Sequence, residues 1–404
     1  MGRLTVSAPG KVILHGEHAV VYGKKALAAS LDLRTYLILT QRADNLIDLH
    51  LPDIEIRLSL QRDIYSKGND IKNVDITKPI PASDEIIETL TKSSGLDADA
   101  SRSQVLAVAS FLYLFTEISR ASKCPLPAID VRVQSELPIG AGLGSSASYS
   151  VCLAAGLLQL GNHIHQSKPS SNTEGYQLDQ SSWSHDETEL INKWAFLSEK
   201  IMHGNPSGVD NSVTTFGGAI EFKKGKIDKL SQMPETRILL VNTKVQRNTK
   251  TLMAHVRTKY EKFGAVIGPV MEAIDAVTTR SIDTYCNLLN NDLPSSSLYK
   301  ELEELIDINQ CLLRTLGVSQ PKLEQVCEIT GASGLHAKLT GAGGGGCAFC
   351  LLRPGTPKAV VREVMSQLKS EGFGCWETNI CGQGVIRHWT HSENYNIPSG
   401  FLPE

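Results

Sequence analysis

A glycine-rich run from Pro138 to Ala147 is the segment best suited to bind an anion. Its glycines occupy alternate positions: Gly140, Gly142 and Gly144. Such glycines let the backbone fold tightly, so that successive N–H groups converge in front of a helix N-terminus, where peptide dipoles favour a phosphate. Ser145 and Ser146 then place hydroxyls at the helix start, where they can cap it, contact phosphate oxygens or ligate a phosphate-bound Mg²⁺.

This run does not match the common nucleotide motifs. No lysine follows the last glycine, as a Walker A loop requires, and the spacing is G-x-G-x-G rather than the dinucleotide G-x-G-x-x-G. A glycine turn that leads into a capped helix is the alternative interpretation.

Ionisable residues stand at the joints between strand-like pieces near the N-terminus. These pieces cover residues 4–7, 11–14 and 19–21. The pattern places Lys11, Glu17 and His18 where buried strands end or turn. A lysine at a strand edge that reaches solvent is the simpler interpretation of Lys11 alone.

Two carboxylates lie at the far end of a predicted helix. The helix opens at Ser184, whose spacing to Glu187 matches a capping box, and it carries Glu199 on the shoulder of its apolar face. The loop 203–211 follows with Asn-Pro and Ser-Gly turn signals, and it directs Asp210 out of a tight bend. Alone, such residues are more often a boundary charge and a helix N-cap or Asx-turn residue.

A second glycine run, residues 341–346, contains G-x-G-x-x-G. A strand pattern at 347–352 follows it instead of a helix, so the dinucleotide interpretation fails its structural requirement. We expect a backbone that packs closely against a phosphate or another loop.

Taken together and in order, three segments resemble the motifs of the GHMP small-molecule kinases: 7–18, 138–147 and 338–347. Within that superfamily the chain is most similar to the mevalonate kinases, because galactokinases carry Arg at the position of Lys11 and a Thr-Asp pair after the histidine. The resemblance covers nearly the whole chain. It implies transfer of the γ-phosphoryl group of ATP to the primary hydroxyl of mevalonate, giving 5-phosphomevalonate in isoprenoid and sterol biosynthesis, with Mg²⁺.

The resemblance also implies residue roles. It makes Asp210 the acceptor of the hydroxyl proton, Lys11 its cationic partner, and Ser146 and Glu199 the Mg²⁺ ligands. The implied ATP contacts are Lys11, Ser135, Gly140, Ala141, Gly142, Leu143, Gly144, Ser145 and Ser146, with Asp53 where relatives tend to carry Asn. The implied substrate contacts are Glu17, His18, Thr249 and Arg247, while Gly341, Gly343 and Gly344 form a supporting loop. Gln246 departs from the pattern, since many relatives carry Pro there.

The elements that must position these residues alternate between strands and helices without strict βαβ repetition, which favours an α+β fold. Apolar helices are predicted near 104–118, 252–278 and 298–316, and a polar surface excursion at 161–186. The length of 404 residues favours two domains, which we place at 1–230 and 231–404. The resemblance implies the two-domain GHMP kinase fold, with an N-terminal mixed sheet and helix domain, a ferredoxin-like α+β C-terminal domain and the active site in the cleft between them.

Composition limits the partners. A net charge of −3 provides no electrostatic footprint for nucleic acid or an anionic membrane, and the longest apolar stretch, 105–115, is too short to cross a bilayer. Nine scattered cysteines are typical of reduced packing residues, so we expect a cytoplasmic protein, with a peroxisomal association left open. Family likeness further implies a homodimer and feedback inhibition by prenyl diphosphates.

Two rival functions stay open. One is a GHMP kinase for another small alcohol, such as phosphomevalonate or a sugar. The other is a ligand sensor that keeps the fold and has lost turnover, which predicts loss of at least one of four residues: Lys11, Ser146, Glu199 or Asp210. All four are present.

Overall fold

The computed structural model describes residues 2–66, 75–97, 99–165, 183–230, 233–246, 248–289 and 295–388. Most of the predicted excursion at 161–186, and Arg247 of the predicted substrate contacts, lie outside these ranges. The strands are β1 (Arg3–His15), β2 (Ala26–Gln41), β3 (Leu46–Leu51), β4 (Ile56–Gln61), β5 (Ile129–Ser135), β6 (Ala219–Lys223), β7 (Lys226–Leu230), β8 (Thr236–Asn242), β9 (Ala337–Leu339), β10 (Cys347–Leu351), β11 (Gly374–Ile380) and β12 (Ile386–His388).

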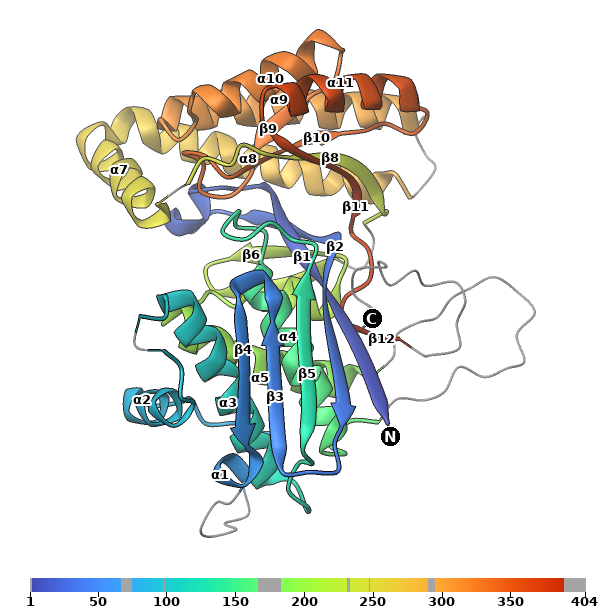
Figure 1. Cartoon of the computed structure of the whole chain (residues 1–404). Coiled ribbons are helices and arrows are strands. Elements are labelled where there is room, and N and C mark those ends of the chain that lie inside the picture. Colours follow the sequence, from blue (N-terminus) through green and yellow to red (C-terminus); the bar gives the residue numbers. More distant parts are fainter. Residues whose placement is uncertain are drawn as a thin grey trace.

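The helices lie in two groups, one for each half of the chain (Figure 1). The first group comprises α1 (Arg62–Ser66), α2 (Asp84–Ser93), α3 (Arg102–Ala121), α4 (Ser145–Leu160), α5 (His185–His203) and α6 (Val209–Phe216). The second comprises α7 (Thr249–Lys262), α8 (Gly264–Asn287), α9 (Ser295–Leu316), α10 (Pro321–Ala332) and α11 (Lys358–Ser370). Two 3₁₀ turns, η1 (Ala19–Tyr22) and η2 (Pro52–Ile54), complete the described elements.

The described strands form one sheet of twelve, in the order β4-β3-β5-β2-β11-β8-β10-β9, with β1, β6, β7 and β12 branching from it. Helices α3, α4 and α5 cover one face of the N-terminal strands, and α8 to α11 cover the C-terminal strands (Figure 1). This arrangement confirms the α+β fold that the sequence predicts.

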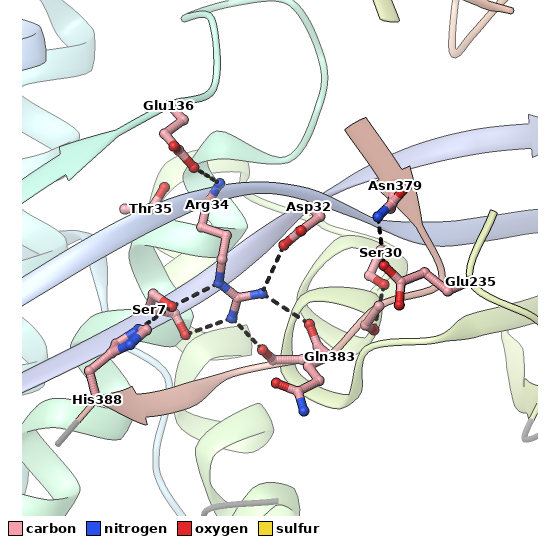
Figure 2. A network of polar contacts seen from close by, with 12 residues as sticks. Ser7, Ser30, Asp32, Arg34, Thr35, Glu136, Glu235, Asn379, Gln383 and His388 are labelled. Atoms are coloured by element: carbon pink, nitrogen blue, oxygen red, sulfur yellow. Dashed lines mark hydrogen bonds and ion pairs between the residues drawn. The ribbon is translucent and has the colours of Figure 1, made fainter. Parts of the chain in front are cut away.

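The predicted division at 230/231 stays a prediction, and two strand pairings cross it. Ile380 of β11 pairs with Leu31 of β2, and β12 pairs antiparallel with β1. A polar network reinforces the second pairing (Figure 2). The buried Arg34 guanidinium donates to the Ser7 hydroxyl at 2.8 Å and to the carbonyl of Gly384 at 2.6 Å, and the His388 ring lies 2.7 Å from the same hydroxyl.

The long central strands correct the sequence prediction of several short ones. Strand β1 continues through Pro9, which has no backbone N–H to donate. The strand tolerates it because the register against β2 shifts between Pro9 and Gly10, as at a β-bulge. Residues 19–21 are a 3₁₀ turn rather than a strand. The predicted helix 252–278 is two helices, α7 and α8, which meet at Phe263 with its non-helical backbone.

Helix ends follow the expected side-chain chemistry. The capping box at the start of α5 is confirmed, since the Ser184 side chain accepts from the backbone of Glu187 and the Glu187 side chain accepts in return. A second capping box, between Ser101 and Gln104, starts α3. None of the helices in the described ranges combines the length and apolar character that a bilayer span requires.

Candidate active site

The glycine loop joins β5 to α4. Gly140, Gly142 and Gly144 all adopt left-handed backbone conformations, with φ of 71°, 74° and 77°. Gly144 is the N-cap of α4, and as a glycine it has no side chain to cap the first N–H groups of this helix. The first turn of α4, with Ser145 and Ser146, therefore keeps backbone donors available for an anion.

Strand β1 carries Lys11 against this loop. The Lys11 N–H donates to the carbonyl of Leu143 at 2.8 Å, which fixes the strand to the loop. A Cβ added to Gly144 would lie 2.9 Å from Cγ of Lys11, so the absence of a side chain at 144 makes room for the lysine. The Lys11 side chain is largely buried, and its Nζ reaches 3.2 Å from Oδ1 of Asp210.

Asp210 lies in the first turn of α6. The N-cap of α6 is Gly208, with φ of 82°, so the helix N-cap interpretation of Asp210 does not hold. Its side chain is 37% exposed, which leaves the carboxylate accessible while Lys11 holds it. The positive end of the α6 dipole also favours a negative charge at this position.

Glu199 is the buried carboxylate of the group, on α5 and only 2% exposed. One carboxylate oxygen lies 3.5 Å from the Ser150 hydroxyl. The pKa of Glu199 is raised to about 8, first by burial and then by the nearby Asp210, and Ser146, Ser150 and Lys11 oppose this shift. The four residues singled out from the sequence therefore influence one another directly.

His203, the last residue of α5, was not predicted. Its Nε2 lies 2.9 Å from the Ser146 hydroxyl and 3.8 Å from a carboxylate oxygen of Glu199. The signal for it in the sequence is its spacing, because residues four apart on a helix lie on the same face.

The predicted nucleotide contacts Ser135 and Asp53 lie together at the end of β5. Asp53, in η2, accepts from the backbone N–H of Ser135 at 2.7 Å. Burial raises the pKa of this aspartate, and the same hydrogen bond opposes the shift. The Ser135 hydroxyl reaches Thr35 at 2.8 Å, and Thr35 in turn reaches Ser148 of α4 at 2.7 Å, which ties this strand end to the helix behind the glycine loop.

The predicted substrate residues fall on two elements. His18 has φ of 59°, and its Nε2 lies 2.8 Å from the carbonyl of Ala342. Glu17 is buried and paired with Lys338 of β9. Thr249 is the first residue of α7 and is exposed, with Asn248 as the N-cap. The roles of all three in binding substrate stay predictions.

The second glycine run connects these elements. Its glycines at 341, 343 and 344 all have positive φ. The N–H of Gly344 donates to Val318, and a Cβ on Gly344 would lie 2.7 Å from Leu252 of α7. Because Ala342 meets His18 and Gly344 packs on α7, the loop contacts both elements that carry the predicted substrate residues.

Within the described ranges, no three His, Cys, Asp or Glu side chains gather closely enough to hold a metal by themselves. Ser146 and Glu199 would supply one hydroxyl and one carboxylate. A Mg²⁺ ion that keeps water and phosphate ligands needs no more than this from the protein.

The chain is similar to known kinases in sequence and in fold. Residues 106–218 match the family GHMP kinases N terminal domain, and residues 295–370 match GHMP kinases C terminal. The mevalonate kinase of Homo sapiens is 46% identical over 95% of each chain, and that of Arabidopsis thaliana is 38% identical over 94% of this chain and 97% of its own. The crystal structure of the Methanococcus jannaschii mevalonate kinase superposes with a TM-score of 0.67 at 22% identity, over 94% of this chain and 99% of the other.

Proposed function

This chain belongs to the mevalonate kinase family of the GHMP kinases, and we propose that it transfers the terminal phosphoryl group of ATP to the primary hydroxyl of mevalonate, giving 5-phosphomevalonate. The observation that carries this proposal is the Lys11–Asp210 pair, 3.2 Å apart, with Ser146 and Glu199 beside it.

Asp210 serves to hold and deprotonate the substrate hydroxyl. A carboxylate is a weak base toward an alcohol, since its usual pKa is about 4. The loose transition state of phosphoryl transfer makes a strong base unnecessary, because the proton leaves late and orientation of the hydroxyl matters most. The exposed edge of Asp210 suits this task.

Lys11 has two tasks in the proposal. Its ammonium lies 3.2 Å from Oδ1 of Asp210 and holds that carboxylate in place for the substrate hydroxyl. It also offers positive charge to the phosphoryl oxygens as they move between donor and acceptor.

The glycine loop binds the phosphates of ATP in this proposal. The left-handed glycines and the uncapped start of α4 present backbone N–H groups, and Ser145 and Ser146 add hydroxyls. These neutral donors hold a polyanion without introducing a base that would compete with Asp210. Ser135 extends the proposed ATP contacts along β5.

Mg²⁺ fits the donor set of Ser146 and Glu199. The buried carboxylate of Glu199 lies 3.8 Å from the ring of His203, and burial, followed by the nearby Asp210, raises its pKa to about 8. Such a group gains from a neighbouring cation. When bound, Mg²⁺ would neutralise charge on the transferring phosphates.

His18 and Thr249 are the proposed mevalonate contacts. Glu17 enters this proposal only indirectly, because both of its carboxylate oxygens already meet protein donors.

Further features of the proposal come from family likeness. We propose a cytoplasmic homodimer that prenyl diphosphates inhibit. Sedimentation of the purified chain and ADP release in the presence of farnesyl diphosphate test the last two. A monomer at assay concentration, or unchanged ADP release, would remove the corresponding feature and leave the activity itself intact.

ADP release with mevalonate, phosphomevalonate and galactose, measured side by side, tests the activity. We expect turnover with mevalonate and little with the other two. A preference for phosphomevalonate or galactose would make the chain a kinase for another alcohol. Binding of mevalonate and ATP without ADP release would make it a ligand sensor.

A further inference from the structure

A fully buried ion pair joins the two halves of the chain next to the proposed substrate site. Lys338 of β9 donates to Glu17, which follows β1, and both side chains are 0% exposed. A pair of this kind is rarely retained for stability alone, because desolvation of two charges offsets most of their attraction, and apolar replacements are often neutral or stabilising. Its presence therefore calls for a role in geometry.

Both members of the pair make further hydrogen bonds to the protein. The second carboxylate oxygen of Glu17 accepts from Asn309 of α9 at 3.1 Å, and Lys338 also donates to the carbonyl of Leu339 at 2.7 Å. Burial raises the pKa of Glu17 and lowers that of Lys338, and in each case the partner's charge opposes the shift. The carboxylate of Glu17 is thus committed to protein donors.

The nearby His15 does not act as a second cation for the Glu17 carboxylate. Burial and the charge of Lys338 hold the pKa of His15 well below its usual range, so that imidazole is neutral. Lys338 supplies the positive charge.

Alternate residues of the segment 338–342 contact three residues at and just beyond the end of β1. Lys338 holds Glu17, the hydroxyl of Thr340 bonds both backbone groups of Ile13, and the carbonyl of Ala342 meets the ring of His18. His18 needs such support, because its φ of 59° is a left-handed conformation that costs a residue with a Cβ about 1–3 kcal/mol.

We propose that Lys338 and Glu17 are positioning residues, which hold His18 in its left-handed conformation so that its side chain meets the substrate. This inference rests on the proposed function, and it replaces the direct substrate contact predicted for Glu17. Removal of the ammonium would leave a buried carboxylate with neutral donors, among them Asn309, and without a positive partner. We expect the turn to rearrange, so that this carboxylate reaches water or becomes protonated.

A double-mutant cycle between Lys338→Met and His18→Ala tests whether the lysine acts through the histidine. The readouts are the dissociation constants of mevalonate and of MgADP, measured by calorimetry. We expect Lys338→Met to weaken mevalonate binding by about tenfold, which corresponds to about 1.4 kcal/mol, and to leave MgADP binding unchanged. In the His18→Ala background, Lys338→Met should weaken mevalonate binding by less than about twofold.

Arg353→Met provides a matched control. Arg353 pairs with Glu303, another buried carboxylate on α9 of the same half, and neither residue contacts His18 among the interactions described. This variant should lower the thermal midpoint and leave mevalonate affinity as in the wild type. Equal losses of mevalonate affinity in Arg353→Met and Lys338→Met would assign the effect to general destabilisation and overturn the inference.

The remaining outcomes also support or overturn the positioning role of Lys338 and Glu17. Should Lys338→Met not fold, the neutral pair Glu17→Gln with Lys338→Met replaces it, and weakened mevalonate binding with normal MgADP binding supports the inference. Normal binding of both ligands in the neutral-pair variant, or full additivity with His18→Ala, overturns it. Absence of mevalonate binding by the wild type would overturn the proposed function and this inference together, whereas wild-type binding with unaffected variants overturns the inference alone.

Discussion

The ammonium of Lys11 lies 3.2 Å from the carboxylate of Asp210, although the two residues are separated by half of the chain. Strand β1 brings the first and the start of α6 brings the second, and the glycine loop packs against the lysine between them. The formation of this one ion pair therefore depends on the positions of β1, α6 and the glycine loop.

Replacement of this carboxylate should abolish most of the turnover. We expect Asp210→Ala to lower kcat by about 10² to 10⁴-fold, because the hydroxyl loses both its orienting group and its proton acceptor. The dissociation constant of MgATP should change little, since the proposed ATP contacts are the glycine loop and Ser135 rather than Asp210. Steady-state ADP release and nucleotide titration measure the two quantities, and near-normal kcat would remove Asp210 from the mechanism.

Two glycines of the loop should respond differently to alanine. Both Gly140→Ala and Gly144→Ala place a Cβ on a left-handed residue, at a cost of about 1–2 kcal/mol. Only at 144 would that Cβ lie 2.9 Å from Lys11, whereas at 140 no heavy atom lies within 4 Å. We expect Gly144→Ala to lower kcat by about 10²-fold through displacement of Lys11. Equal kcat in the two variants would show that Gly144 does not set the position of the lysine.

Glu199→Gln should raise the Mg²⁺ concentration needed for half-maximal activity. The amide keeps the shape and the neighbouring Ser150, but it lacks the charge that favours a divalent ion. The measurement is a Mg²⁺ titration at saturating ATP. A titration curve that superposes on the wild type would exclude Glu199 as a ligand.

The polar network at β12 should contribute strongly to stability. Arg34 is 6% exposed. Arg34→Met would remove the guanidinium that donates to the Ser7 hydroxyl and to the carbonyls of Gln383 and Gly384. We expect this to lower the free energy of unfolding by about 3 kcal/mol or more. Arg42→Met is the comparison, because this arginine, directly after the end of β2, pairs with three aspartates that have exposed side chains. Thermal unfolding should show a much smaller loss for Arg42→Met, and equal losses would contradict the assignment.

His388 should make stability depend on pH at the acid side. Burial, and then the charge of Arg34, lowers its pKa to about 4, compared with about 6.5 in an unfolded chain. The unfolded state therefore binds more protons between these values, so this contribution to stability is complete above about pH 6.5 and is lost as the pH falls toward 4. The difference in thermal midpoint between pH 7 and pH 4.5 should be smaller for His388→Asn than for the wild type, and an unchanged difference would reject this histidine as the source.

The fold class and the convergence of four motif residues could be predicted from the sequence, while the bounds of several strands and helices could not. Motif residues such as Lys11, Ser146, Glu199 and Asp210 come together as the family resemblance implied, because their types follow from the chemistry. Local patterns failed where tertiary pairing overrides them, as at Pro9, where the partner strand accommodates a bulge. Lys338 was missed because its partner Glu17 lies 321 residues away and follows only from the folded topology, whereas the spacing of His203 to Glu199 on one helix was a usable signal.

The attachment of β12 to β1 also bears on how the enzyme is made. The His388 ring and the Ser7 hydroxyl that it contacts are 381 residues apart, so a ribosome must deliver almost all of this sequence before the contact can form. The same late segment bonds to the end of α6 through Val385 and Thr215. During translation α6, which carries Asp210, therefore lacks this contact until Val385 has been made, and a nascent chain interrupted before residue 385 never forms it.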